Sequence, residues 1–154
     1  FMTQDEPDET AIYLVKHAPR PTLLIPAKIP EPGTVIIAWD GSVQAARAMS
    51  SFVALRIHQG CEVHVLTIHK DHQVAGEVID RAMRYLGHHQ VNAHRQMHIT
   101  THDTGDFILN KVTELRAELL VMGAYGKSGL KEFFFGSVTK NLLKHCPVPI
   151  LLDH

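Results

Sequence analysis

Three glycines and one serine near the C-terminus have the residue types and the spacing of a phosphate-binding turn. Gly123 and Gly126 follow an apolar run, and after nine further residues Gly136 and Ser137 begin an amphipathic segment. Glycine lets the backbone approach a ligand closely, and the free N–H groups at a helix start favour an anion such as phosphate. The pattern therefore indicates a nucleotide-binding strand, glycine turn and helix start.

Two better-known phosphate loops do not fit this stretch. Gly126, Lys127 and Ser128 match the end of the Walker pattern, but Val121 stands where its first glycine would be. The dinucleotide pattern needs Gly-x-Gly, whereas this chain has two residues between Gly123 and Gly126. A phosphate loop here is therefore of another type.

The spacing of these glycines resembles the nucleotide-binding signature of the universal stress protein family, in its ATP-binding branch. Residues 34–42 are similar to the first strand of that family and its Asp-Gly-Ser turn, and residues 118–123 to its fourth strand. Residues 142–152 are similar to its closing helix and strand. Order and spacing agree from about residue 33 to residue 152, and this combination is more specific than the glycine loop alone.

Predicted strands and helices alternate along the chain. Strands are expected at 35–39, 63–68, 91–100, 119–122 and 148–152, and helices at about 42–57, 71–86, 103–115 and from 137 onward. This alternation predicts an α/β fold with an open five-stranded parallel sheet and helices on both faces. The family resemblance implies the strand order 3-2-1-4-5.

In that order the first and fourth strands are neighbours whose connections leave in opposite directions, and ligands bind at such a point. The resemblance implies that Asp40 contacts the adenosine of ATP, that Met122 and Gly123 line the nucleoside, and that the turn and helix start cradle the phosphates, with or without Mg²⁺. The expected nucleotide-binding residues are Ala38, Trp39, Asp40, Gly41, Met122, Gly123, Gly126, Lys127, Gly136, Ser137 and Val138.

Several of these residues also have purely structural interpretations. Asp40 could be a helix cap that shares this role with Ser42, because short polar side chains bind free N–H groups at helix starts. Trp39 alternates away from Asp40 in the strand, which is more typical of a core or helix-facing side chain than of a base-stacking one. Lys127 could neutralise phosphate charge or be a solvated loop residue.

Composition bounds the class of protein. The chain has 154 residues, a formal net charge of -1, 45% hydrophobic residues and two cysteines. These values predict one compact domain without a disulfide framework, without a basic field for nucleic acid and without an apolar run of membrane-spanning length. Cytoplasm is the expected location.

An internal repeat suggests a tandem origin. Residues 14–24 and 142–152 agree at Leu, Lys, His, Pro, Pro, Leu and Leu at one constant offset. We therefore expect residues 1–26 to be the last helix turn and strand of a preceding similar domain, residues 27–33 to be a linker, and residues 34–154 to be the nucleotide-binding domain. The remnant strand should pair antiparallel with the last strand, within one chain or exchanged in a dimer; the resemblance likewise implies a homodimer or pseudo-dimer through that strand.

The twelve histidines raise the question of a metal site. His94, His98 and His102 are four residues apart, but that spacing aligns ligands only on a helix, and this segment is predicted to be a strand and a loop. Because the segment carries no carboxylate or cysteine cluster, we expect no metal site. No catalytic residue is predicted either, since no general base can be assigned near the expected phosphates.

Three functions remain open from the sequence. The first is an adenine-nucleotide-binding regulatory module of the stress response, in which ATP changes conformation or association, as the resemblance implies. The second is a nucleotide-free interaction or scaffold domain of the same fold. The third is a slow ATPase, and the intact glycine pattern favours the first of these.

Overall fold

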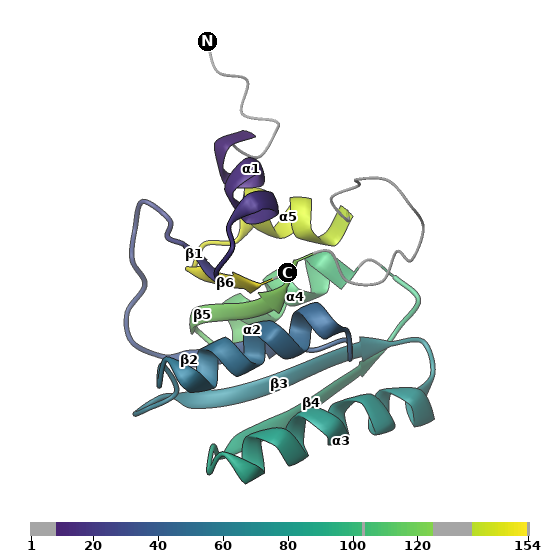
Figure 1. Cartoon of the computed structure of the whole chain (residues 1–154). Coiled ribbons are helices and arrows are strands. Elements are labelled where there is room, and N and C mark those ends of the chain that lie inside the picture. The colour runs from purple at the N-terminus through teal and green to yellow at the C-terminus, as the bar shows by residue number, and fades with distance from the viewer. Residues whose placement is uncertain (1–8, 103, 125–136, 154) are drawn as a thin grey trace.

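The computed structural model describes residues 9–102, 104–124 and 137–153 (Figure 1). Its strands are β1 (Thr22–Leu24), β2 (Thr34–Ala38), β3 (Glu62–His69), β4 (Ala93–Ile99), β5 (Ala117–Gly123) and β6 (Ile150–Asp153). Its helices are α1 (Glu9–His17), α2 (Val43–Ala54), α3 (His72–His88), α4 (Thr104–Glu114) and α5 (Ser137–His145). The predicted alternation of strands and helices is confirmed.

The strands form one six-stranded sheet in the order β1-β6-β5-β2-β3-β4. The five strands from β2 to β6 run parallel to one another, in the order expected for them, and β1 pairs antiparallel with β6. The bounds differ from the prediction by one to three residues at several ends: the last strand begins at Ile150 rather than at residue 148, and α2 ends at Ala54 rather than at about residue 57.

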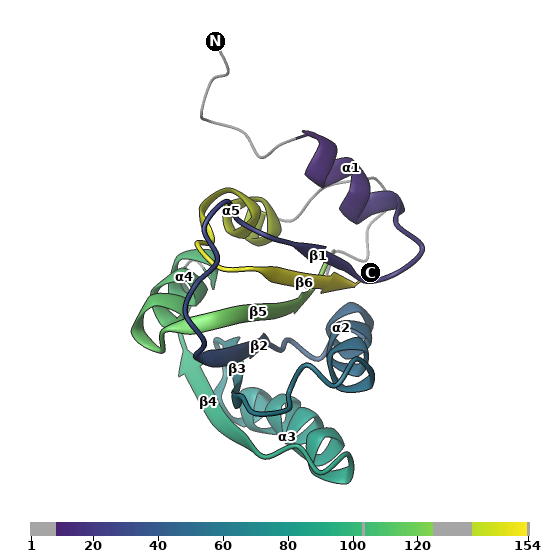
Figure 2. The ribbon, with the colours of Figure 1, turned by 90° about the vertical axis from the view of Figure 1, so that its left-hand side faces the viewer.

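Helices cover both faces of the sheet, α2 and α3 on one side and α4 and α5 on the other (Figure 2). Alternate residues of the central strand β2 supply both cores, with Val35 and Ile37 packed among residues of α2 and α3 and Ile36 among residues of α4 and α5. Because a central parallel strand is buried on both faces, its sequence is an unbroken apolar run.

Polar side chains fix where α2 and α3 begin. Ser42 is the N-cap of α2, as expected, and Asp71 is the N-cap of α3, where its carboxylate accepts a hydrogen bond from the Val74 amide at 3.0 Å. That backbone hydrogen bond lowers the pKa of Asp71, because it stabilises the ionised carboxylate. Both helix starts follow strands at the same edge of the sheet, so the caps hold the chain at the rim of the site described below.

The short N-terminal elements belong to the same folded unit. Val15 of α1 is only 2% exposed and packs in the core formed with α4 and α5. β1 pairs residue by residue with β6, with Leu23 opposite Leu151. The predicted antiparallel pairing is therefore formed within one chain.

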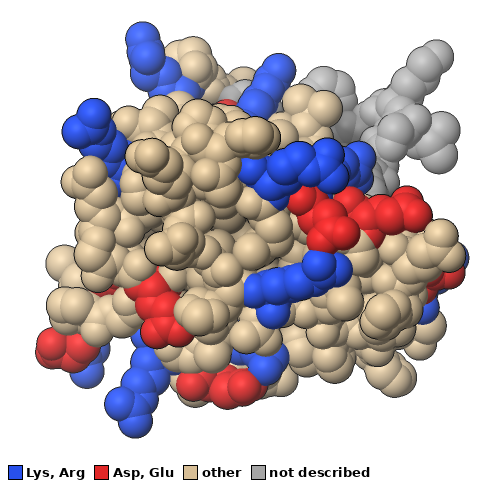
Figure 3. Space-filling view, turned by 90° about the horizontal axis from the view of Figure 1, so that it is seen from below, with Lys and Arg blue, Asp and Glu red and all other residues tan. Residues whose placement is uncertain are grey.

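Charged side chains of both signs are interspersed over the face of the molecule seen from below (Figure 3). This face has no continuous field of one sign, in line with the formal net charge of -1. Within the described ranges, none of the helices has both the length and the apolar composition needed to cross a bilayer.

Candidate functional site

A cavity of about 650 Å³ lies where the carboxyl ends of the parallel strands meet the helix starts. Residues from β2, β3 and β5, the segment after β4, and the first turns of α4 and α5 line it. The neighbouring strands β2 and β5 are the ones whose connections leave in opposite directions, which makes them the switch point of the sheet. Their last paired residues are Ala38 and Met122. The cavity is thus at the position where a doubly wound sheet binds its ligand.

Most of the described residues predicted for the site do line this cavity. They are Ala38, Trp39, Asp40, Met122, Gly123, Ser137 and Val138. Gly41 is not among the lining residues; it forms the turn before α2 with a φ of 79°, a conformation that glycine adopts without strain. The predictions for Gly126, Lys127 and Gly136 lie outside the described residues.

Asp40 combines a structural contact with a position at the cavity. Its side chain is half-buried, and Oδ1 accepts a hydrogen bond from the Ser42 amide at 2.9 Å. Ser42 in turn accepts from the Ala45 amide with its hydroxyl at 3.1 Å. Asp40 therefore holds the turn that leads into α2, while Ser42 is the N-cap of that helix. One hydrogen bond does not exhaust a carboxylate, which has roughly four acceptor positions.

Trp39 is held mainly by the protein rather than by the cavity. Its side chain is buried, and the indole N–H donates to the Val78 carbonyl of α3 at 2.7 Å. Its own carbonyl accepts from the Thr67 hydroxyl at 2.9 Å. The helix-facing interpretation is confirmed by this contact with α3, and Trp39 also lines the cavity.

Gly123 has a packing role that the sequence interpretation did not include. A Cβ atom added there would lie 2.6 Å from the carbonyl carbon of Gln44 and closer still to the Ala45 amide nitrogen. Both of those atoms belong to the backbone of α2, so they cannot move aside as a side-chain tip would. Gly123 therefore lets α2 approach β5 closely, and this approach sets one wall of the cavity.

The cavity extends further across the sheet than the sequence analysis predicted. Its lining also includes residues at and after the ends of β3 and β4 and at the starts of the helices that were not predicted for the nucleotide site: Ser42, Ile68, His69, Lys70, Thr100, Thr101, His102, Thr104 and Thr139. The signal for many of them was available, because all parallel strands end at the same edge, so residues after the second and third strands also reach it.

The charges around the cavity suit an anionic ligand that also carries hydroxyl groups. Among the lining residues that the structure describes, Asp40 is the one carboxylate, and Lys70 and two histidines supply basic groups. Ser137, the first residue of α5, is at the rim, where the N–H groups of a helix start favour negative charge.

A second group of polar side chains lies at the opposite ends of the strands. Glu62 and His64 on β3 meet His94 on β4, with the Glu62 Oε1 atom 2.9 Å from His64 Nε2 and 3.4 Å from His94 Nε2. Of the three histidines considered from the sequence, His94 thus lies beside a carboxylate that is distant in the chain, Glu62, which the sequence analysis did not anticipate. His98 instead stacks on Phe107, with ring centroids 3.6 Å apart.

Comparison with known proteins identifies a family for most of this chain. The sequence profile described as "Universal stress protein family" matches residues 32–154. The chain is 22% identical over 147 residues to the universal stress protein Slr1230 of Synechocystis. That alignment covers 90% of this chain and 48% of the relative, so the chain spans about half the length of the curated relative it matches.

Solved structures share the fold. A universal stress protein from Archaeoglobus fulgidus DSM 4304 superposes with a TM-score of 0.68 at 20% identity, covering 86% of this chain and 49% of that one. A universal stress protein family member from Arabidopsis thaliana, solved with AMP bound, gives a TM-score of 0.61 at 17% identity, covering 79% of this chain and 91% of that one. At such identities the likeness establishes the fold, and the ligand belongs to the Arabidopsis protein.

Proposed function

Because the chain belongs to the universal stress protein family, we propose that it binds an adenine nucleotide, ATP in the first place, in the cavity between β2 and β5. The domain would act as a regulatory module of the stress response in the cytoplasm, with the nucleotide changing its conformation or its association. The observation that carries this proposal is the meeting of Asp40, Met122 and Ser137 around one cavity at the switch point of the sheet.

Size and chemistry support a nucleotide over a smaller ion. A volume of about 650 Å³ falls within the range of roughly 300–1,000 Å³ that small-molecule sites occupy. The AMP bound to the Arabidopsis relative of the same fold is the same class of ligand. Each part of a nucleotide finds a matching group in the cavity. Met122 and Ile68 suit the apolar base, the Asp40 carboxylate suits the hydroxyls, and the start of α5 suits the anionic phosphates.

In the proposed orientation the adenosine lies near Asp40 and Met122. The carboxylate accepts hydrogen bonds from ribose hydroxyls or from the adenine amino group, since an ionised aspartate is a pure acceptor. The phosphates lie toward Ser137 and Val138 at the start of α5. The glycines between β5 and α5 in the sequence, Gly126 and Gly136, would complete the phosphate site, and Mg²⁺ would bind through the phosphate oxygens.

The proposed role is binding rather than catalysis, with slow ATP hydrolysis as the most that we expect. A second candidate, a nucleotide-free interaction domain, is favoured by one specific observation. Several large apolar side chains of the N-terminal elements and the segment after them are exposed, namely Tyr13 at 62%, Leu14 at 48%, Leu23 at 47%, Ile25 at 59% and Ile29 at 72%. Such a number of exposed large apolar side chains within residues 13–29 favours a segment that contacts another protein.

The register of β1 on β6 supports a pseudo-dimeric association. The repeat aligns Thr22, Leu23 and Leu24 with Ile150, Leu151 and Leu152, whereas the observed pairs are Thr22 with Leu152, Leu23 with Leu151 and Leu24 with Ile150. Equivalent strands thus pair about a local two-fold axis through Leu23 and Leu151, the relation found in isologous interfaces. We propose that residues 1–26 derive from a preceding domain of the same kind, and that a second domain would sit across this axis.

Ligand identity tests the nucleotide proposal directly. Purified protein is denatured, and the released small molecules are identified by mass spectrometry; calorimetry on nucleotide-free protein then compares ATP, AMP and GTP. We expect adenine nucleotides to bind and GTP to bind more weakly, because adenine carries an amino donor at position 6 from which Asp40 can accept, whereas guanine carries a carbonyl acceptor there. No heat of binding with ATP in large excess would contradict the proposal and leave the interaction domain as the better account.

Deletion of residues 1–26 tests the association proposal. Without β1 the β6 edge presents unpaired backbone groups, so we expect sedimentation to show a dimer or higher species, or lower solubility. Deletion of residues 1–8 alone keeps α1 and β1 and is the matched control. If both deletions sediment and melt like the full chain, the N-terminal elements have no role in association.

A further inference from the structure

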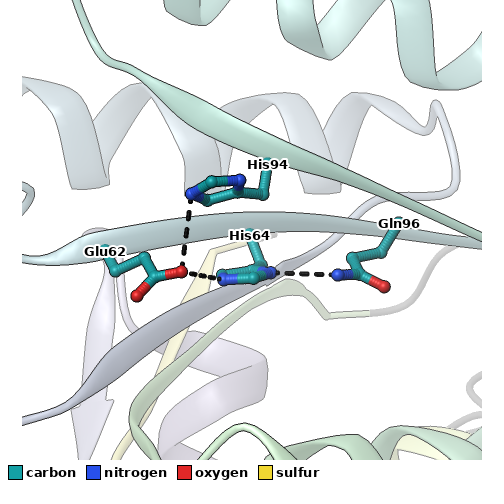
Figure 4. A network of polar contacts seen from close by, with 4 residues as sticks. All are labelled: Glu62, His64, His94 and Gln96. Carbon is teal, nitrogen blue, oxygen red and sulfur yellow. Dashed lines mark hydrogen bonds and ion pairs between the residues drawn. The ribbon is translucent and has the colours of Figure 1, made fainter.

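Three potential metal ligands converge near the beginning of β3 (Figure 4). The cavity lies at the other end of this strand, at Leu66, Ile68 and His69. Glu62, His64 and His94 each offer one ligand atom, and these atoms lie within 4.8 Å of one another. Both histidines direct Nε2 toward the same carboxylate oxygen, at 2.9 and 3.4 Å. The stacked rings of His64 and His94 have centroids 4.7 Å apart.

The backbone of the sheet holds these three side chains together. Glu62 and His64 are two residues apart on β3 and therefore point to the same face of the sheet. His64 is opposite His94 in the register of the β3–β4 pair, which places His94 on that face too. Ligands on adjacent paired strands keep their spacing without help from a loop, so the site is positioned before any ion arrives.

Burial is graded in a way that suits metal binding. The His64 side chain is 8% exposed and is fixed within the sheet, whereas Glu62 and His94 are 58% and 63% exposed and can adjust. Metal–ligand bonds of about 2.1 Å put neighbouring ligand atoms roughly 3.0–3.4 Å apart, close to the two distances to Glu62 Oε1. A small rotation of exposed side chains would therefore bring all three atoms to bonding distance.

Gln96 provides a neighbour that can orient the buried ring. Its amide nitrogen lies 3.2 Å from His64 Nδ1. When His64 Nε2 donates to Glu62, Nδ1 accepts from this amide; when Nε2 binds a metal, Nδ1 carries the proton and the Gln96 amide oxygen can turn to accept it. A glutamine can serve both tautomers because its amide has a donor and an acceptor.

The alternative to a metal site is an ion pair, in which Glu62 contacts protonated histidines and no metal is bound. The hydrogen bond from His64 lowers the pKa of Glu62, with the charges of His64 and His94 acting in the same direction. However, exposed ion pairs of this kind contribute little to stability. An ion pair also needs only one imidazole beside the carboxylate, whereas here two imidazoles contact a single carboxylate oxygen. Two imidazole nitrogens and one carboxylate are the ligand set of several open zinc centres.

We propose that Glu62, His64 and His94 bind a divalent transition metal ion of the zinc class, with water completing the coordination. Imidazole ligands select Zn²⁺, Co²⁺, Ni²⁺ or Cu²⁺ over Mg²⁺. The site is independent of the nucleotide, since it uses the first residues of β3 whereas the cavity uses Ile68 and His69 at its end.

The test uses the full chain without an affinity tag, freed of metal by chelation, and titrated with zinc chloride in a calorimeter and with Co²⁺ in an absorption spectrometer. We expect one ion per chain, visible Co²⁺ bands and no heat with Mg²⁺. His94→Ala and Glu62→Gln should each weaken Zn²⁺ binding by at least about a hundredfold, since each removes a direct ligand. Their exposed side chains make the fold tolerant of both changes, and melting without metal checks this.

His88→Ala is the matched control, because it also removes an exposed histidine but from the end of α3. It should bind Zn²⁺ like the wild type. Gln96→Leu should weaken binding about tenfold with one ion still bound, and Gln96→Glu, whose carboxylate can accept from Nδ1–H, should restore it. No binding by the wild type, or equal binding by wild type, His94→Ala and Glu62→Gln, would overturn the proposal, the latter outcome indicating an adventitious ion only.

Discussion

The two ends of the parallel strands present different kinds of chemistry. At the carboxyl ends, turns and helix starts surround a cavity of about 650 Å³ that combines apolar side chains, Asp40 and the start of α5. At the opposite end of β3 and β4, three strand side chains converge within 4.8 Å. The first arrangement suits a large organic anion, and the second suits a single ion.

The difference follows from how each site is positioned. The cavity depends on backbone conformation after each strand, through caps such as Ser42 and the close approach at Gly123. The cluster depends on strand register alone, because His64 is opposite His94. Substitutions that alter backbone packing should therefore affect the cavity, whereas single side-chain changes should affect the cluster.

The largest expected effect comes from Gly123→Ala. Its Cβ would press against the backbone of Gln44 and Ala45, so α2 must move away from β5. We expect the free energy of unfolding to fall by about 1–3 kcal/mol and nucleotide affinity to fall with it. Urea denaturation and ATP calorimetry measure the two quantities.

Gly87→Ala is the matched control for that change. Gly87 is in α3, and among the described residues no atom beyond its chain neighbours and the backbone of its own helix lies within 4 Å of an added Cβ. Alanine there should stabilise the protein by roughly 0.5–1 kcal/mol, since glycine is a poor residue inside a helix. Equal effects of the two substitutions would mean that the approach of α2 to β5 is not a constraint.

A smaller effect is expected from Asp40, and a pair of variants separates its two roles. Asp40→Asn keeps an oxygen that can accept from the Ser42 amide, whereas Asp40→Ala removes it. Alanine should reduce ATP affinity about tenfold, equivalent to about 1.4 kcal/mol, and should also lower the melting temperature. Asparagine should keep the melting temperature but still weaken ATP binding, because it has fewer acceptor positions. Unchanged affinity in both variants would leave Asp40 with only its structural role in the turn before α2.

The smallest effect is expected at Asp71, at the start of α3. Its pKa is lowered in the folded protein by the Val74 amide, so its contribution to stability is present above the unfolded pKa of about 3.9 and is lost as pH falls through the folded value. The difference in melting temperature between wild type and Asp71→Asn should therefore be constant near neutral pH and shrink in acid. A difference that stays constant down to the acid limit would contradict this cause.

The sequence predicted the cavity better than the cluster, for a physical reason. Parallel strands end at one edge, so residues such as Asp40 and Met122 could be brought together from their places in the chain. The sequence analysis did not predict that the cavity reaches Lys70 and Thr100. These residues also follow parallel strands, so they lie at the same edge of the sheet. The packing role of Gly123 was missed because a close approach between elements leaves no local signal.

The cluster could not be predicted, because it depends on which residue of β4 faces which residue of β3. Strand β4 has a largely polar sequence at the edge of the sheet, so hydrophobic alternation does not fix its register. Spacing along the chain suggested His94, His98 and His102 as the group to consider, but the structure instead pairs His94 with Glu62 and His64. The antiparallel pairing of β1 was predictable, since the repeat marks two equivalent strands.

The most direct test of the account is an amide NMR titration of the full chain with ATP. We predict chemical-shift changes at Asp40, Met122 and Ser137 that saturate at one nucleotide per chain, with Glu62 and His94 unaffected. Zn²⁺ should produce the converse pattern. An absence of ATP-dependent shifts, or shifts centred away from the carboxyl ends of β2 and β5, would contradict nucleotide binding in this cavity.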